Sequence, residues 1–140
     1  ADAAVLAKAA GVDVPKTVEL LFGETEADHP FVVAEQMMPF LPVVRAGNVD
    51  EAIEMAVKAE HGFRHTAIIH SGNLDNVTRM ARRLNTTLFV HNGTCAASLG
   101  LGGPGYLSYS IATPTGEGVT TPLTFTRQRQ LVIGDTLNYL

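Results

Sequence analysis

The sequence contains a single cysteine, Cys95, and no tryptophan. One cysteine excludes an internal disulfide framework and fits a reducing compartment, so we expect a cytoplasmic protein. No apolar run reaches the roughly 18 residues that a membrane-spanning helix needs. The first ten residues also lack the basic start of a signal peptide. We therefore expect a soluble chain that carries no targeting segment and has no membrane partner.

Charged residues are scarce as well, at 17% of the chain, against roughly 25% in typical soluble domains. The net charge of −4 comes with one small basic cluster, Arg79, Arg82 and Arg83, so we expect no nucleic-acid partner. The length of 140 residues allows one domain or part of one. Because the chain opens on Ala1 inside a predicted helix, we expect it to be part of a larger protein. The low charged fraction also leads us to expect that a partner covers some of its apolar surface.

A metal-binding pattern is also missing. The five histidines match no metal-ligand spacing, and one cysteine cannot complete a typical structural zinc site, so we expect no metal. His61, His65 and His70 flank or enter one predicted strand, where a histidine could titrate near neutral pH. For each of them a structural role is the more common one.

What is present is an alternation of strands and helices. Strands are predicted at residues 40–44, 66–70 and 87–91. A helix capped by Asn48 follows the first strand, with Glu51 three residues later, and a helix running from Leu74 to Leu84 follows the second. The βαβαβ order predicts an α/β fold with a parallel sheet, whose ligands gather at the carboxyl ends of the strands. These ends lie at Arg45, His70 and His91.

The two ends of the chain have a different character. Near the start, residues 18–22 predict a strand closed by Gly23, followed by an exposed acidic loop at residues 24–28. After Asn92 the pattern contains no helix. It predicts a glycine-rich loop up to Gly105, a strand at residues 106–112, a turn at 113–118 and a β-rich end at 123–140. Such strands expose unpaired edges, so we expect them to pair outside the chain.

Glycines 100, 102 and 105 match the spacing G-x-G-x-x-G of dinucleotide-binding folds, but the surroundings do not. That motif opens a helix, whereas Pro104 and the alternating residues after Tyr106 are typical of a strand. Two interpretations stay open: a loop packed closely against a ligand or another segment, and a plain connecting loop.

Two further residues have a functional and a structural interpretation. Cys95 follows His91 by four residues, which could indicate a thiolate activated by an imidazole. A small buried thiol is the better interpretation from spacing alone. Glu35 lies in an otherwise apolar stretch. An ion pair with Arg45 or Arg64 and a hydrogen bond from a ligand hydroxyl explain it equally well.

Residues 35–45, EQMMPFLPVVR, resemble the E-x-F-G-P segment of aldehyde dehydrogenases. Glu35 and Pro39 match the first and last residues of this motif. Met37 and Met38 replace phenylalanine and glycine, which is similar to the CoA-acylating branch of the superfamily. Further segments resemble the same branch in the same order, and they look nearest to the propionaldehyde and acetaldehyde dehydrogenases of propanediol and ethanolamine utilisation: residues 64–71, 87–93, 99–103 and 113–118.

The resemblance implies an activity and a set of site residues. It implies oxidation of a short-chain aldehyde with NAD and coenzyme A to acyl-CoA and NADH, through a cysteine thioester. In that family the nucleophile and the nucleotide-binding domain precede this region, so Cys95 is not expected to be the nucleophile. Implied cofactor contacts are Glu35, Met37 and Pro39. The implied aldehyde-pocket residues are Asn92, Thr94 and Cys95, and His65 is implied as an acid/base or positioning residue.

The resemblance also implies an organisation. Residues 1–122 correspond to the carboxy-terminal part of a catalytic domain, and residues 123–140 to a strand segment that joins a homo-oligomer. The remainder of the same enzyme is then the main partner, and a bacterial microcompartment is one expected location. Two alternatives stay open. One is a non-catalytic binding or assembly module, and the other is a non-acylating semialdehyde dehydrogenase.

Overall fold

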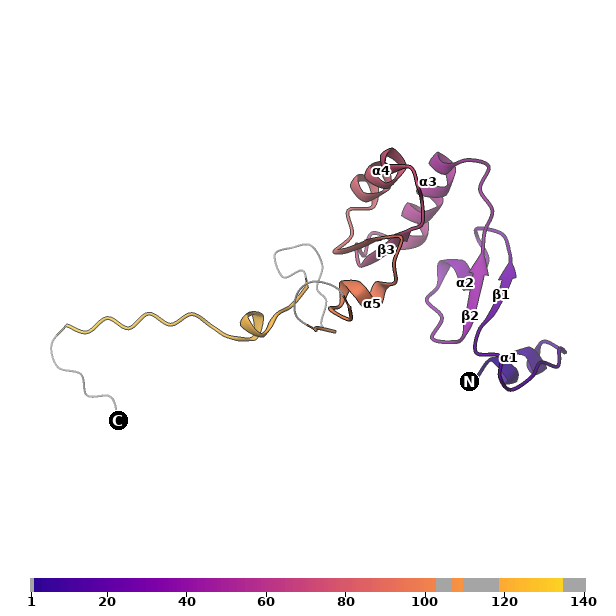
Figure 1. Ribbon diagram of the computed structural model, residues 1–140, viewed down its shortest axis with the longest axis horizontal. Helices are drawn as coiled ribbons and strands as arrows, with labels where there is room; N and C mark the ends of the chain where they lie inside the picture. The colour runs from indigo at the N-terminus through magenta and orange to yellow at the C-terminus, as the bar shows by residue number, and fades with distance from the viewer. Residues whose placement is uncertain (1, 103–106, 110–118, 135–140) are drawn as a thin grey trace. The chain divides into compact units, whose positions relative to one another are not determined.

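The computed structural model describes residues 2–102, 107–109 and 119–134. The chain forms two compact units, Ala1–Gly62 with Thr78–Leu84, and Phe63–Val77 with Asn85–Leu140. Each unit contains one pair of parallel strands (Figure 1). Helices alternate with these strands along the chain. The predicted α/β class and parallel pairing are therefore confirmed, but the described strands form two separate pairs in place of the one sheet predicted from the three strands near residues 40, 66 and 87.

In the first unit, β1 (Leu21–Glu24) pairs with β2 (Phe40–Val43), and Phe22 lies opposite Leu41. The prediction of a strand at residues 18–22 is wrong in position, because Gly23 lies inside the strand. A Cβ atom on Gly23 would lie 3.3 Å from the ring of Phe40. The missing side chain thus lets the aromatic ring pack closely on the strand.

Two short helices accompany this strand pair. The predicted helix at the start is α1 (Ala3–Ala9), in which Ala3 and Ala7 are buried and Asp2 caps the first turn. The second, α2 (Pro30–Val33), was not predicted. Proline at its first position and the ring of His29 accepting the Phe31 N–H at 3.1 Å define its start. Phe31 then meets the Phe40 ring edge-on, with centroids 5.6 Å apart.

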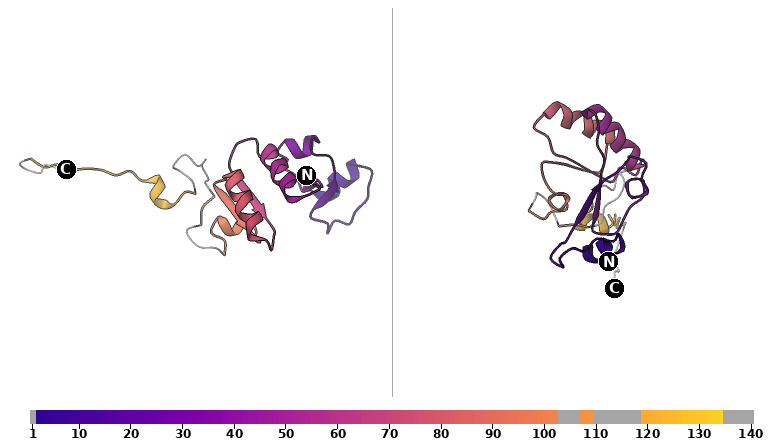
Figure 2. Two further views of the ribbon diagram at one scale, coloured as in Figure 1. Left: turned by 90° about the horizontal axis from the view of Figure 1, so that it is seen from above. Right: turned by 90° about the vertical axis from the view of Figure 1, so that its right-hand side faces the viewer.

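The predicted amphipathic helix is α3 (Val49–Glu60). Asn48 caps it as expected, accepting the Glu51 N–H at 3.0 Å, and Ile53 is its buried residue. From Thr78 onward, α4 (Leu74–Leu84) lies in the same unit. Ion pairs between Arg79 and Asp50 and between Arg83 and Glu54 join the two helices, which lie side by side (Figure 2).

In the second unit, β3 (Thr66–Ile69) pairs with β4 (Leu88–His91), and Ile69 lies opposite His91. Three residues of this pair are buried: Leu88 and Val90 on one face, and Ala67, which lies opposite Phe89, on the other. The expectation of no helix after Asn92 is wrong, since α5 (Cys95–Ser98) and the 3-10 helix η1 (Pro122–Phe125) follow. Both are single turns, too short to show a helical period in the sequence.

The β-rich end predicted at residues 123–140 contains no strand in its described part, residues 123–134. Residues 107–109 and 126–134 form neither helix nor strand. The strand predicted at residues 106–112 falls mostly outside the described residues, and the turn predicted at 113–118 falls wholly outside them. Among the residues that the structure describes, no helix is long and apolar enough to cross a membrane.

Candidate functional site

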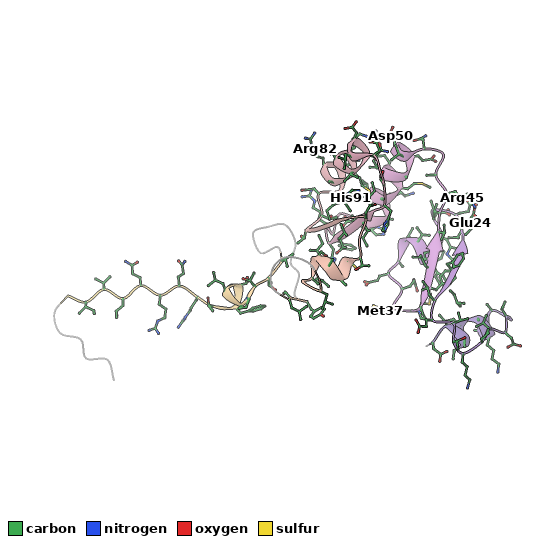
Figure 3. The ribbon with its side chains drawn as sticks, viewed as in Figure 1. Glu24, Met37, Arg45, Asp50, Arg82 and His91 are labelled. Carbon is green, nitrogen blue, oxygen red and sulfur yellow. The ribbon has the colours of Figure 1, made fainter. Side chains whose placement is uncertain are left out.

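The segment between α2 and β2 carries the residues predicted to contact a nucleotide. Glu35 is exposed, and the side chain of Met37 is 92% exposed. Arg45 pairs with Glu24 at 2.6 Å, so the proposed ion pair between Glu35 and Arg45 is wrong. Figure 3 shows Glu24 and Arg45 at one end of the strand pair and Met37 toward the other. The Glu35 carboxylate thus faces solvent.

His61 holds the start of this segment in place. It is the C-cap of α3 with a left-handed backbone (φ 57°). Its Nε2 atom lies 2.7 Å from the carbonyl oxygen of Val33, the last residue of α2. The amide of Gln36 then donates to the Ala34 carbonyl at 3.0 Å. No specific role for His61 is predicted from the sequence, where its position at the end of a predicted helix is the available signal.

These residues fit a nucleotide contact of the kind that the resemblance implies. An exposed carboxylate accepts hydrogen bonds from ribose hydroxyls strongly because its charge assists them. An exposed methionine side chain provides a flexible, polarizable surface against which a ring can pack. Pro39 is half-buried directly before β2.

A polar cavity of about 290 Å³ lies at the carboxyl ends of β1 and β2. Arg45, predicted to lie at such an end, lines it together with Glu24, Glu26 and Glu51. The lining thus contains three carboxylates and one cation, Arg45, which is already paired with Glu24. No group of three His, Cys, Asp or Glu side chains among the described residues could hold a metal ion.

In the second unit, the structure does not bring His65 to the predicted aldehyde-pocket residues. His65 directly precedes β3, and its Nδ1 atom lies 2.6 Å from the Thr66 hydroxyl oxygen. The segment from Asn92 to Cys95 follows β4. Because Thr66 lies opposite Leu88 in a parallel pair, the two features lie at opposite ends of the strands. His65 lies level with Thr87, which precedes Asn92 by five residues, so roughly 16 Å separates the two features at about 3.3 Å per residue.

Asn92 instead meets Ser71, the second residue after β3. The Asn92 Oδ1 atom accepts the Ser71 N–H at 2.9 Å, and its Nδ2 atom donates to the Ser71 carbonyl at 3.2 Å. His91 Nε2 lies 2.8 Å from the same carbonyl oxygen. No role for Ser71 is predicted from the sequence. The available signal is that His70 and His91 are predicted to end neighbouring parallel strands, so the residues after them meet at one edge.

Thr94 and Cys95 follow at the start of α5. Thr94 is the N-cap, but its side chain makes no capping hydrogen bond. Cys95 is exposed, so the interpretation of a buried thiol is wrong. Activation of Cys95 by His91 finds no support either, because no hydrogen bond joins these two described residues and His91 Nε2 lies against the Ser71 carbonyl oxygen. Both side chains are therefore open to a ligand.

The glycines that follow form a connecting turn. Gly100 and Gly102 have left-handed backbones (φ 95° and 75°), and the Leu101 N–H donates to the Ala96 carbonyl at 3.1 Å. Up to Gly102 the chain thus folds back on α5. Gly105 lies outside the described residues.

The exposed Glu35 segment and the loop at residues 92–95 lie in the segments that resemble aldehyde dehydrogenases. No family model matches the chain. The comparison with curated proteins nevertheless confirms similarity to the CoA-acylating branch. The chain is 54% identical over 134 residues to the acetaldehyde dehydrogenase (acetylating) EutE of Salmonella typhimurium, covering 96% of this chain. It spans 29% of that relative's length.

Solved structures agree. A propionaldehyde dehydrogenase of Rhodopseudomonas palustris with bound CoA and an acylated cysteine matches 94% of this chain and 30% of its own, with 45% identity and TM-score 0.84. One from the fucose utilisation microcompartment of Clostridium phytofermentans matches 99% and 32%, with 43% identity and TM-score 0.85. An engineered glycolyl-CoA reductase with bound NADP+ matches 95% and 30%, with 44% identity and TM-score 0.85.

Proposed function

We propose that this chain works as part of an enzyme that converts a short-chain aldehyde, NAD and coenzyme A into acyl-CoA and NADH. The observation that carries the proposal is 54% identity along 96% of the chain to an acetylating acetaldehyde dehydrogenase. Support also comes from a similar structure that holds CoA and an acylated cysteine. Because the chain spans 29% of that relative, we assign the nucleophilic cysteine and the rest of the nucleotide site to the remainder of the enzyme.

In this proposal the first unit contributes to the nucleotide site. Glu35 accepts hydrogen bonds from the ribose hydroxyls, while Met37 and Pro39 flank the ring. The bound nucleotide supplies the hydride acceptor, and the protein supplies position and electrostatics. The exposure of Glu35 and Met37 supports this assignment, since both are accessible to a ligand.

The second unit contributes the aldehyde pocket. The segment at residues 92–95 forms part of its wall, with Thr94 and Cys95 facing the ligand. The nucleophilic thiolate adds to the aldehyde carbonyl, and loss of hydride leaves a thioester. The thiol of coenzyme A then displaces the enzyme cysteine, which a thioester permits readily. For His65 we propose a positioning role, because its ring is bonded to the Thr66 hydroxyl at the other end of the strands.

We assign residues 123–140 to contacts between subunits of a homo-oligomer. Their described part exposes apolar side chains, including Leu123, Phe125 and Val132. We place the enzyme in the cytoplasm, enclosed in a microcompartment shell. The similar structure from a fucose utilisation microcompartment supports this location.

The test is to mix the complete enzyme with propionaldehyde, NAD and coenzyme A and to follow NADH by absorbance. We expect turnover that depends on coenzyme A, and we expect Cys95→Ser to retain it. Loss of all turnover in Cys95→Ser, or turnover by the 140-residue chain alone that this substitution abolishes, contradicts the placement of the nucleophile. Release of the free acid in place of the acyl-CoA indicates a non-acylating dehydrogenase. Absence of any turnover favours a binding or assembly module.

A further inference from the structure

Asn92 links the ends of β3 and β4, and we propose that it is a positioning residue for the loop at residues 93–95 and makes no contact with the aldehyde. The inference rests on the proposed function, which gives this loop its meaning. Both polar atoms of the Asn92 amide are bound to the Ser71 backbone, at 2.9 and 3.2 Å. The plane and direction of the amide are therefore set by Ser71.

Two further hydrogen bonds, from the Asn92 backbone and from the neighbouring His91, support this link. The Asn92 N–H donates to the Ile69 carbonyl at 2.9 Å, which continues the ladder between the two strands. His91 Nε2 lies 2.8 Å from the Ser71 carbonyl oxygen. Two consecutive residues thus hold the turn after β3 through four hydrogen bonds. The direction in which the chain leaves β4 is fixed by these bonds.

The backbone at Asn92 needs this support. Its φ of 51° lies in the left-handed region, which asparagine tolerates better than most residues. At the next residue, a Cβ atom on Gly93 would lie 3.3 Å from the Val90 side chain, so the loop runs close to β4. The turn delivers Thr94, without a capping bond, and the exposed Cys95 to the ligand side.

The test is Asn92→Gly in the complete enzyme. Glycine keeps the left-handed backbone and removes only the amide. We expect the aldehyde KM to rise about tenfold, the effect of losing two hydrogen bonds that orient a pocket loop. The KM for NAD should stay unchanged, since Glu35 lies in the other unit. Asn85→Gly is the matched control: Asn85 is also left-handed (φ 49°) but follows α4, and we expect both KM values to stay unchanged.

A second measurement does not depend on activity. Alkylation of Cys95 by iodoacetamide, followed by peptide mass spectrometry, reports how the loop presents its thiol. We expect a different labelling rate in Asn92→Gly and an unchanged rate in Asn85→Gly. Asn92→Asp keeps the acceptor for the Ser71 N–H but places a carboxylate oxygen, which repels the Ser71 carbonyl oxygen, where the amide donor was. We therefore expect Asn92→Asp to change both measurements as well, which covers the case in which Asn92→Gly does not fold.

Wild-type values of both aldehyde KM and Cys95 labelling in Asn92→Gly would overturn the assignment. Wild-type values of both in Asn92→Asp would overturn it too, because that variant also loses the hydrogen bond to the Ser71 carbonyl. If the unmodified enzyme produces no NADH, the proposed function is wrong. The labelling rates then decide the positioning role by themselves.

Discussion

Glu35 is the residue on which the nucleotide assignment depends most. In Glu35→Gln the side chain keeps its size but loses the charge that strengthens hydrogen bonds from hydroxyls. We expect the KM for NAD to rise about tenfold, with little change in the aldehyde KM. Steady-state kinetics of the complete enzyme with each substrate varied in turn measures both. Glu19→Gln removes a similarly exposed carboxylate as the control. Equal effects of the two substitutions contradict the assignment.

At Glu35 and Cys95 the sequence predicts the segment but not the exposure of the side chain. The apolar neighbours of Glu35 suggest burial, whereas the structure leaves its carboxylate in solvent. Burial of Cys95 was expected because free cysteine is among the residue types most often buried. The structure instead leaves it exposed. The link between Asn92 and Ser71 depends on the register of β3 against β4, in which Ile69 lies opposite His91, 22 residues further along the chain. Such a register is not encoded in any local pattern.

At the scale of the element, the cap of α3 gives a stability prediction. Asn48 accepts the Glu51 N–H at 3.0 Å, which satisfies a donor that the helix leaves unpaired. We expect Asn48→Ala to lower the free energy of unfolding of the complete protein by about 1 kcal/mol. Asn48→Asp keeps an oxygen at the same place and should cost little. Urea unfolding measures both. An Asp variant as unstable as the Ala variant contradicts the capping role.

The ion pair between Arg83 and Glu54 makes the contact of α3 with α4 sensitive to acid. The hydrogen bond from Arg83 lowers the pKa of the Glu54 carboxyl below its ordinary value. The pair therefore stabilises the folded state above the ordinary pKa of about 4.3. This stabilisation is lost as the pH falls through the lower pKa of the folded protein. Because both side chains are exposed, the effect is small.

Melting temperatures of the complete protein measured from neutral to acidic pH test this coupling. We expect Glu54→Gln to melt below the unmodified protein at neutral pH, with the difference closing in acid. Glu19→Gln, which removes an exposed carboxylate from another segment, should show no such closing difference. A difference that is constant across the whole pH range would falsify the coupling.

The elements that the sequence predicted well are those with a clear period. The helix after Asn48 and the strands that begin near Phe40 and Thr66 lie where the patterns place them. The strand near Leu21 was displaced because Gly23 was interpreted as a terminator, whereas it packs under the Phe40 ring. The single-turn helices α2, α5 and η1 contain too few residues for any period.

At the scale of the whole molecule, the tail gives a prediction about assembly. Val132 is 80% exposed, between the exposed Leu131 and Ile133. Three consecutive exposed apolar residues are typical of a segment that pairs with another chain. We expect Val132→Lys to lower the oligomeric state of the complete enzyme, measured by light scattering after size-exclusion chromatography. Arg129→Lys, which preserves charge in the same segment, is the control. An unchanged mass for Val132→Lys contradicts the assignment of this segment to subunit contacts.

The division of α4 between the two units limits how such a protein can be divided into fragments and recombined with its relatives. The chain passes from the first unit to the second after Gly62, returns at Thr78 and leaves again after Leu84. One backbone break at residue 62 therefore removes residues 78–84, and with them Arg79 and Arg83, from the partners Asp50 and Glu54. Neither unit can be transplanted by a single crossover. We expect recombination among relatives to exchange this whole region as one block.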